Sequence, residues 1–237
     1  MHLHFEYTYV FNTKVYADEM TVSNRGSMTR ITPTTAPITR RRAATRDRLV
    51  GAAQEVFAER GFHGASVEDI CERAQFTRGA FYSNFSSKDE LVVEIAARYS
   101  ERLLAGIAEI AERDDLDLAQ IVDAVLEVWT SDRREREMWF LLHTEFTLYT
   151  IRDRPVGRSW ARQQAGVRKS LAALIDQICA RRGLALDVGS EQIARVAMAL
   201  FSSGTSQHLL EPRAIADGAL GSTFLPLILQ AVAHPLA

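Results

Sequence analysis

Residues 66–91 read SVEDICERAQFTRGAFYSNFSSKDEL, and this stretch decides the fold class of the chain. Its apolar residues recur at helical spacing on either side of a short break, which predicts two short amphipathic helices joined by a tight turn. Ser66 and Thr77 suit the N-cap positions, because a hydroxyl there accepts a hydrogen bond from a backbone N–H of the first turn. Ser87 and Glu90 form a capping-box pattern, which predicts a further helix.

The second helix of the pair has an outer face unlike that of an ordinary surface helix. Phe81 and Phe85, four residues apart, supply its packing face. The remaining side chains are small or hydrogen-bonding, whereas a plain bundle helix would carry charged helix formers. This is the organisation of a helix-turn-helix whose second helix enters the major groove of DNA. We therefore expect residues of this segment to contact bases or phosphates, namely Ser66, Thr77, Arg78, Gly79, Ala80, Tyr82, Ser83, Asn84 and Lys88.

The expected contacts follow from side-chain chemistry. Arg78 can donate two hydrogen bonds to a guanine edge, and Asn84 can address an adenine. Tyr82 and Lys88 suit phosphate oxygens, as do Ser66 and Thr77 through the N–H groups of helix N-termini. The alternative is that the segment is simply two exposed helices of a bundle.

A basic segment precedes the pair. Residues 39–50 read TRRRAATRDRLV, with five arginines against one acid, and apolar residues at helical spacing follow as far as Phe57. Gly61 is a natural C-cap for this first helix. We expect Arg41, Arg42 and Arg46 to reach phosphates or an adjacent minor groove, where affinity is driven by charge.

Composition narrows the class of protein. The 237 residues are 47% hydrophobic with a formal net charge of -2, so DNA affinity must come from a local basic region. The two cysteines are too few for a disulfide framework or a zinc site. No apolar run approaches the ~20 residues that span a bilayer, so we expect no membrane association and a cytoplasmic protein.

Enzyme signatures are absent from the sequence. It contains no Gly-x-Gly-x-x-Gly, phosphate-binding loop, His-Glu-x-x-His or Gly-x-Ser-x-Gly motif. We therefore predict no catalytic residue, metal or cofactor, and a protein that is not an enzyme.

The chain reads as all-α. The apolar residues of 1–38 show no sustained helical or strand period, and the segment ends in a Thr- and Pro-rich run, so we expect it to be a disordered tail. Met20 or Met28 is an alternative translation start to Met1. Beyond the pair, helical patterns interrupted by Gly, Pro and Asp predict helices at 87–112, 118–131, 134–152, 156–182, 190–210 and 214–233, with no alternating strand pattern. We expect a DNA-binding domain at 39–92, with its helix-turn-helix at 66–85, and a larger helical domain at 93–237.

Residues 74–91 closely resemble the end of the DNA-binding domain of tetracycline-repressor (TetR/AcrR) family regulators. The matching positions are Ala74, Thr77, Gly79, Tyr82, Phe85, Ser87, Lys88 and Leu91, and the resemblance covers roughly 44–95. It implies an all-helical homodimer with an N-terminal three-helix DNA-binding domain, which binds a double-stranded, pseudo-palindromic operator and is usually a repressor released by a small molecule.

The chain departs from the family pattern at three positions. Gln75 stands where the family commonly has Gly, so the turn must carry a side chain, and we expect a less favourable backbone angle there. Phe76 replaces a smaller Val, and Asn84 replaces His. These differences leave the fold intact and make the operator sequence unpredictable.

The predicted helix at 134–152 is apolar nearly all round, so we expect it to be central in the larger domain. The family builds its ligand cavity between such helices, and a largely apolar or aromatic effector is implied. Plain core packing is the competing interpretation for each residue. Glu145 could recognise a cationic ligand, but we expect it to pair with an arginine from 152–168, because a buried charge must be paired. The candidates for ligand contact are Trp129, Trp139, His143, Phe146, Tyr149, Trp160, Met198, Phe201 and His208.

The last two predicted helices carry small residues at their apparent contact points and abundant leucine. By resemblance they form the dimer interface, although they could instead close the core of the monomer. The leading hypothesis is a ligand-responsive repressor, and the alternative is a ligand-independent regulator or an activator.

Overall fold

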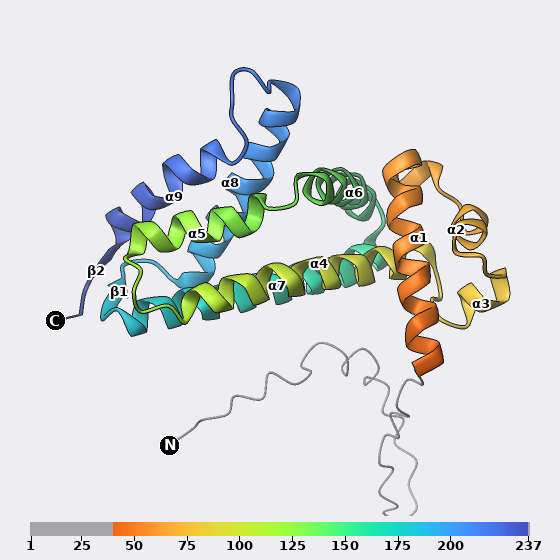
Figure 1. Cartoon of the computed structure of the whole chain (residues 1–237), viewed down its shortest axis with the longest axis horizontal. Helices are drawn as coiled ribbons and strands as arrows, with labels where there is room; N and C mark the ends of the chain where they lie inside the picture. The colour runs from red at the N-terminus through yellow and green to blue at the C-terminus, as the bar shows by residue number, and fades with distance from the viewer. Residues whose placement is uncertain (1–39, 237) are drawn as a thin grey trace, which may run out of the picture. The chain divides into compact units, whose positions relative to one another are not determined.

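The computed structural model describes residues 40–236, so the predicted tail at 1–38 lies outside the described residues. The fold class is confirmed, because helices make up 80% of the described chain (Figure 1). The elements in order are α1 (Arg40–Gly64), α2 (Val67–Ala74), α3 (Arg78–Tyr82), α4 (Lys88–Ala111), α5 (Leu118–Thr130), α6 (Arg133–Arg152), α7 (Arg154–Arg181), β1 (Leu184–Leu186), α8 (Ser190–Leu210), α9 (Ala219–Val232) and β2 (Ala233–Pro235).

The helix starts around the helix-turn-helix follow the local chemistry. Ser66 caps α2 in a reciprocal box with Asp69, and Thr77 caps α3 by accepting from the Ala80 N–H, as predicted. Ser87 caps α4 through the Glu90 N–H. The Glu90 carboxylate, however, accepts from the N–H and hydroxyl of Ser86, so the predicted capping box at Ser87 is only half formed.

Two residues in the left-handed region set the path of the chain through α1–α3. Gly61, with φ 67°, interrupts α1 and separates its last turn, which agrees with the predicted C-cap. Gln75, with φ 56°, ends α2 and donates its N–H to carbonyls of that helix. It is the one non-glycine residue with positive φ among residues 40–236, so the turn does carry a side chain at a costly angle.

One hydrophobic core joins α1–α4 to the N-terminal part of the larger region. The fully buried Phe81, Phe85 and Leu49 belong to the same cluster as Phe146 of α6 and Trp160 of α7. The predicted domain boundary after residue 92 falls inside the uninterrupted helix α4. The division into two domains therefore stays a prediction.

Phe62 is the centre of the contact between α1 and α6. Its N–H donates to Glu145 Oε2 at 2.6 Å, and its ring lies 5.0 Å from that of Phe146. Lys88 donates to the Phe62 and Ala65 carbonyls at 2.6 and 2.8 Å. The prediction that Glu145 pairs with an arginine from 152–168 is wrong, because its carboxylate instead accepts from the backbone after Gly61.

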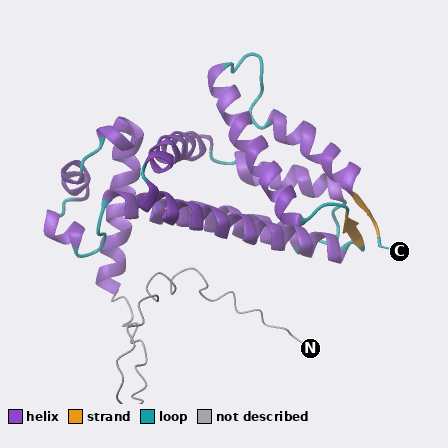
Figure 2. Ribbon diagram, turned by 180° about the vertical axis from the view of Figure 1, so that it is seen from behind, coloured by secondary structure: helices purple, strands orange, loops and turns teal. Residues whose placement is uncertain are grey.

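The remaining helices form a bundle beside this core. Helices α4 and α7 lie side by side, and α5, α8 and α9 pack around a second cluster that includes Val122, Phe201 and Leu225 (Figures 1 and 2). Gly204 and Gly221 allow the close approach, since a Cβ on Gly221 would lie 2.8 Å from the Phe201 ring. Part of the predicted small-residue set thus closes the core of the monomer.

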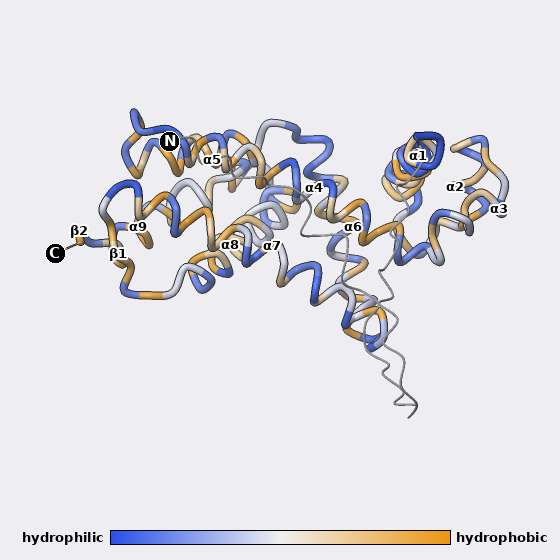
Figure 3. Tube along the Cα trace, turned by 90° about the horizontal axis from the view of Figure 1, so that it is seen from below, coloured by the Kyte–Doolittle hydropathy of each residue, from blue (hydrophilic) through white to orange (hydrophobic). Residues whose placement is uncertain are grey.

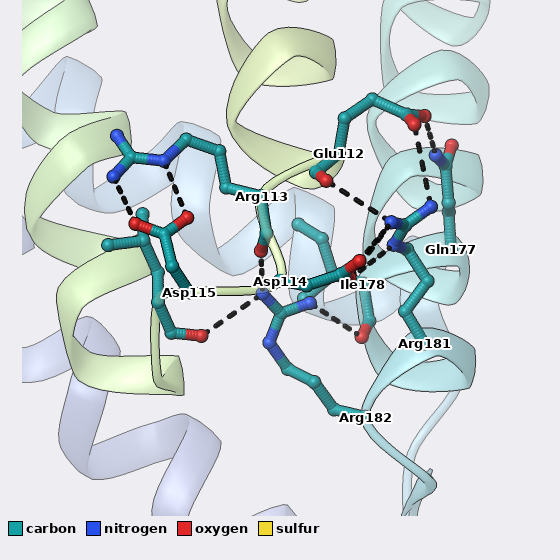
Figure 4. Close-up of polar contacts among 9 residues, drawn as sticks. Glu112, Arg113, Asp114, Asp115, Gln177, Ile178, Arg181 and Arg182 are labelled. Atoms are coloured by element: carbon teal, nitrogen blue, oxygen red, sulfur yellow. Dashed lines mark hydrogen bonds and ion pairs between the residues drawn. The ribbon is translucent and has the colours of Figure 1, made fainter.

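A polar clamp fixes the far end of α4 to the end of α7. Arg181 binds Asp114 through two nitrogens, at 2.9–3.1 Å, and Arg182 donates to the carbonyls of Arg113 and Leu116 (Figure 4). Bidentate geometry makes such a network stronger than an isolated surface pair.

Three sequence predictions need correction. A short antiparallel pair, β1 with β2, is present although no strand was predicted. Helix α9 begins at Ala219 and not at 214, because residues 212–214 form a turn and Gly218 enters the helix with φ 73°. Helix α6 is not buried all round, since Leu141, Leu148 and Ile151 form an exposed stripe opposite its buried face.

Hydrophobic and hydrophilic residues alternate along the long helices (Figure 3). Within residues 40–236, no helix is both long and apolar enough to cross a membrane.

Gln75→Gly is expected to raise the free energy of unfolding by about 0.5–1 kcal/mol. It removes the cost of a Cβ in the left-handed region, and the greater freedom of glycine in the unfolded chain offsets part of this gain. Chemical denaturation measures the effect. Gln75→Ala, which keeps a Cβ, should give no such gain, and a destabilised Gln75→Gly would show that the turn is not strained.

Candidate nucleic-acid interface and internal cavity

Helix α3 is held from beneath by two phenylalanines. Phe81 and Phe85 are 0% and 1% exposed, as expected for the packing face. On the opposite side of α3, five of the expected contact residues are exposed: Thr77, Arg78, Gly79, Tyr82 and Ser83. Ala80, which lies among them, is half-buried. This outer face has few long side chains, so a groove floor could approach the α3 backbone closely.

Arg78 and Tyr82 form a pair on this face. The Arg78 guanidinium lies 5.9 Å from the Tyr82 ring centroid and 2.5 Å from Glu68 Oε1. A hydrogen bond to Tyr82 and the charge of Glu68 raise the pKa of Arg78. Because this ion pair is exposed, water screens it and the guanidinium can exchange Glu68 for another acceptor at little cost.

Arg46 and Asn84 do not face outward, contrary to the sequence prediction. Arg46 donates to the Asn84 carbonyl at 2.6 Å and to Glu94 at 2.8 Å, and its guanidinium lies over the Phe85 ring. Asn84 is buried, and its amide donates to the Ala80 carbonyl at 2.8 Å. Both side chains are therefore committed to holding the end of α3 against α1 and α4.

Lys88 is also engaged internally. Its ammonium donates to two backbone carbonyls and lies 4.3 Å from the Phe62 ring centroid. Burial lowers its pKa. The two backbone carbonyls occupy donors of this ammonium, and the phosphate contact by Lys88 stays a prediction.

The remaining predicted contacts lie at two helix N-termini. Arg41 and Arg42 are exposed in the first turn of α1, and Arg42 donates to the Ser83 carbonyl at 3.3 Å, which brings the basic segment next to α3. Ser66 caps α2, where Glu68 and Asp69 occupy the first turn. These two acids make the α2 N-terminus a weak phosphate site.

An internal cavity of about 120 Å³ lies between α4, α5, α6, α7 and α8. Aliphatic side chains of α4 and α7 form much of its wall: Leu103, Leu104, Ile107, Val167 and Leu171. Aromatic and thioether groups add Trp129, Trp139, Phe140 and Met198, and the polar groups are Tyr99, Ser100, Arg136, His143, Gln164, Ser202 and Thr205. An apolar wall with a few polar groups is typical of small-molecule sites.

A larger hollow, of about 310 Å³, lies between α1 and α2. Its charged side chains already bind one another, since Arg73 pairs with Glu55 and Arg48 donates to the Ala74 carbonyl. It has no apolar wall comparable to that of the internal cavity, and we assign no ligand to it.

Comparisons with known proteins agree with the resemblance seen in the sequence. A family model described as bacterial regulatory proteins, tetR family, matches residues 49–95. The transcriptional regulator UidR of Escherichia coli (strain K12) is 41% identical over 68 residues, which are 29% of this chain and 35% of UidR. The matched region thus spans about a third of that relative.

Two further proteins match over most of their length. The transcriptional repressor BepR of Brucella suis is 25% identical over 198 residues, covering 81% of this chain and 94% of BepR. The structure of GusR from Salmonella enterica superposes with a TM-score of 0.62 at 26% identity, over 79% of this chain and 94% of GusR.

Residues 49–95 match the tetR family of bacterial regulatory proteins, which confirms the resemblance predicted from the sequence. UidR and BepR are named as transcriptional regulators, in agreement with the prediction that this chain is not an enzyme.

The nine candidate ligand contacts divide between the cavity and the surrounding core. Trp129, Trp139, His143 and Met198 line the cavity. The other five lie elsewhere: Phe146, Tyr149 and Trp160 pack in the cluster around Phe62, Phe201 packs between α5, α8 and α9, and His208 bonds the Ile215 carbonyl. Sequence spacing placed these residues on buried helix faces but could not tell which face adjoins an opening.

Arg136 is the polar cavity residue that the sequence analysis missed. It lies in the charged run RREREM, which reads as a solvated helix start, yet its side chain is 3% exposed. Its spacing could have indicated this position, because Arg136 precedes Trp139 by three residues and His143 by seven and therefore lies on the same helical face.

Arg46→Ala is expected to lower the free energy of unfolding by about 2 kcal/mol, because it leaves the Asn84 carbonyl without its charged donor and leaves Glu94 with Arg98 alone. Denaturant unfolding followed by circular dichroism measures this. Arg41→Ala, at an exposed position of the same helix, is the matched control and should leave stability unchanged. Equal stability of both variants would show that Arg46 has no structural role.

Proposed function

We propose that the chain is a ligand-responsive transcriptional repressor, which binds a pseudo-palindromic operator as a homodimer in the cytoplasm and is released by a small molecule. The observation that carries this proposal is the outward face of α3. Phe81 and Phe85 anchor the helix, while Arg78 and Tyr82 stand on its exposed side with Gly79 between them. BepR is named as a transcriptional repressor, which supports repression over activation.

The chemistry of this face fits base and phosphate contacts. Arg78 can exchange Glu68 for a guanine edge, whose two acceptors match the guanidinium fork. Tyr82 and Thr77 suit phosphates, and Arg41 and Arg42 extend a positive strip beside α3. Lys88, Asn84 and Arg46 have no direct part in this proposal.

The homodimer is proposed on the exposed apolar side chains of α8 and α9. Val196 and Leu210 lie on α8, and Phe224 and Leu227 lie on α9. Exposed apolar side chains on two helices that pack against one another favour burial against a second copy. Two recognition helices about 34–36 Å apart would then meet successive turns of one duplex face.

Release by ligand is proposed to act through α6. The first half of this helix lines the cavity with Arg136, Trp139 and His143, and Glu145, only two residues further on, binds the Phe62 N–H of α1. A ligand that shifts α6 therefore shifts the support of the recognition helix. A preference of about 1–3 kcal/mol for the shifted state is enough to loosen operator binding substantially.

Selection of duplexes from a random pool by the full chain should enrich an inverted repeat. On the enriched sequence, Arg78→Ala and Tyr82→Ala are each expected to weaken binding at least about tenfold, because each removes a contact worth about 1–3 kcal/mol. Gel shift measures the affinity, and circular dichroism checks that the helices are intact. Arg134→Ala, an exposed arginine of α6, is the matched control. Enrichment of no sequence, or wild-type affinity in both α3 variants, would end the proposal.

Leu227→Glu is expected to convert the dimer to a monomer, because it places a charge in the proposed apolar interface. Leu148→Glu is the matched control, since Leu148 of α6 is 53% exposed and Leu227 is 55% exposed. Size-exclusion chromatography with light scattering gives the mass of each variant. A wild-type monomer, or dissociation by Leu148→Glu alone, would place the interface elsewhere.

A further inference from the structure

The internal cavity contains one permanent charge. Among the lining residues that the structure describes, Arg136 alone is a permanent cation, and none is an acid. Burial lowers the pKa of His143, which favours its neutral form. Burial and the charge of Glu135 raise the pKa of Tyr99 to about 12, so its hydroxyl keeps its proton at neutral pH. The cavity wall is therefore apolar with a single positive centre.

The Arg136 guanidinium is only partly satisfied by the protein. Its Nη2 pairs with Asp217, and its Nη1 reaches the Trp129 carbonyl at 3.4 Å. Its Nε has no hydrogen-bond partner although it is fully buried. A buried donor of a charged group without an acceptor is unfavourable, and an anionic oxygen is the acceptor that matches it best.

His143, on the same α6 face as Arg136, supplies a neutral hydrogen-bond donor. Gln164 Nε2 lies 3.2 Å from His143 Nε2. A neutral imidazole carries one N–H donor in either tautomer, and the Gln164 amide can pair with His143 Nε2 in either role. His143 is thus a neutral donor on the face that bears Arg136, and it adds no charge that would oppose an anion.

The volume limits the size of the occupant. The cavity measures about 120 Å³, and a closed apolar cavity of about 150 Å³ is known to hold a benzene ring. A ligand with an apolar body the size of one ring therefore fits after a small widening. Trp129 and Trp139 in the wall suit a planar body.

We propose that the effector is a small organic carboxylate, with a ring-sized apolar body among the aromatic side chains and its carboxylate on the Arg136 guanidinium. This inference names the ligand class of the cavity and rests on the proposed function only for its regulatory consequence. The carboxylate accepts from the unpartnered Nε, and it weakens the ion pair between Nη2 and Asp217 because both anions then share one guanidinium charge.

The competition connects the cavity to the proposed dimer interface. Asp217 lies in the segment between α8 and α9, directly before Gly218, the N-cap of α9. Asp217 holds this segment to α6 through Arg136. A carboxylate that shares the guanidinium therefore loosens the start of α9, so ligand binding can change the relation between the two copies as well as the position of α6.

Three probes of one shape test the charge preference: benzoate, benzyl alcohol and benzylamine. Each is titrated into the full wild-type chain, with binding followed by the fluorescence of the cavity tryptophans and by calorimetry. We expect saturable binding of benzoate, at least tenfold weaker binding of benzyl alcohol, and none of benzylamine. Equal affinities for the three probes, a preference for benzylamine, or no binding of any probe would overturn the proposal, and the wild-type chain is sufficient for this test.

Variants then locate the charge. Arg136→Gln should remove the preference for benzoate and keep the weaker binding of benzyl alcohol, which shows that the cavity is intact. Asp217→Asn should tighten benzoate binding several-fold, because the competing carboxylate is gone. A merely structural role of the pair would instead make both variants weaken all probes alike. Arg102→Gln, which removes an exposed arginine paired with Glu135, is the control and should leave benzoate binding unchanged.

The two proposals fail separately. Selection of duplex DNA needs none of these probes, so an enriched operator together with no benzoate preference overturns the ligand class alone. Benzoate binding that depends on Arg136, in a chain that enriches no DNA sequence, retains the ligand class and overturns the regulatory function.

Discussion

The contact at Phe62 is the constraint on which the arrangement of the other helices depends. Gly61 turns the chain with a positive φ, and a Cβ there would lie 2.8 Å from the Glu145 carboxylate. The turn exposes the Phe62 N–H to Glu145 of α6, while Lys88 of α4 binds the carbonyl of the same residue. Three helices thus meet at one backbone unit, and the Phe62 ring fills the space between them. Any displacement of α6 must be transmitted to α1 or break these bonds.

Helix α6 reaches both the cavity and α1 because successive turns of the helix carry residues with different contacts. Arg136, Trp139 and His143 lie toward the cavity, and Glu145 and Phe146 lie toward α1. Because α1 supports α3 through Arg46 and the Asn84 carbonyl, the path from cavity to recognition helix consists of packed side chains and charged hydrogen bonds. Such contacts transmit rigid displacements better than loops do.

Local chemistry made much of the fold predictable. Ser66, Thr77 and Gly61 fixed helix ends through hydrogen bonds and backbone angles within a few residues, and most predicted helices begin and end within one or two residues of the observed ones.

The side chains that the sequence placed differently from the structure depend on contacts distant in sequence. Lys88, Asn84 and Arg46 have the side chains of DNA contacts, and only the fold reveals that they bind carbonyls. Arg136 looked solvated because its partner, Asp217, is 81 residues away.

The most direct test of the account is the distance between the two copies of the helix-turn-helix. A spin label on Glu72→Cys, at an exposed position of α2 away from the outer face of α3, reports it by pulsed electron resonance, and both native cysteines are buried. The account predicts one narrow distance when the selected operator is bound, and a shifted or broader distribution when ligand displaces the DNA. Absence of an intermolecular distance, or one that neither DNA nor ligand changes, would contradict it.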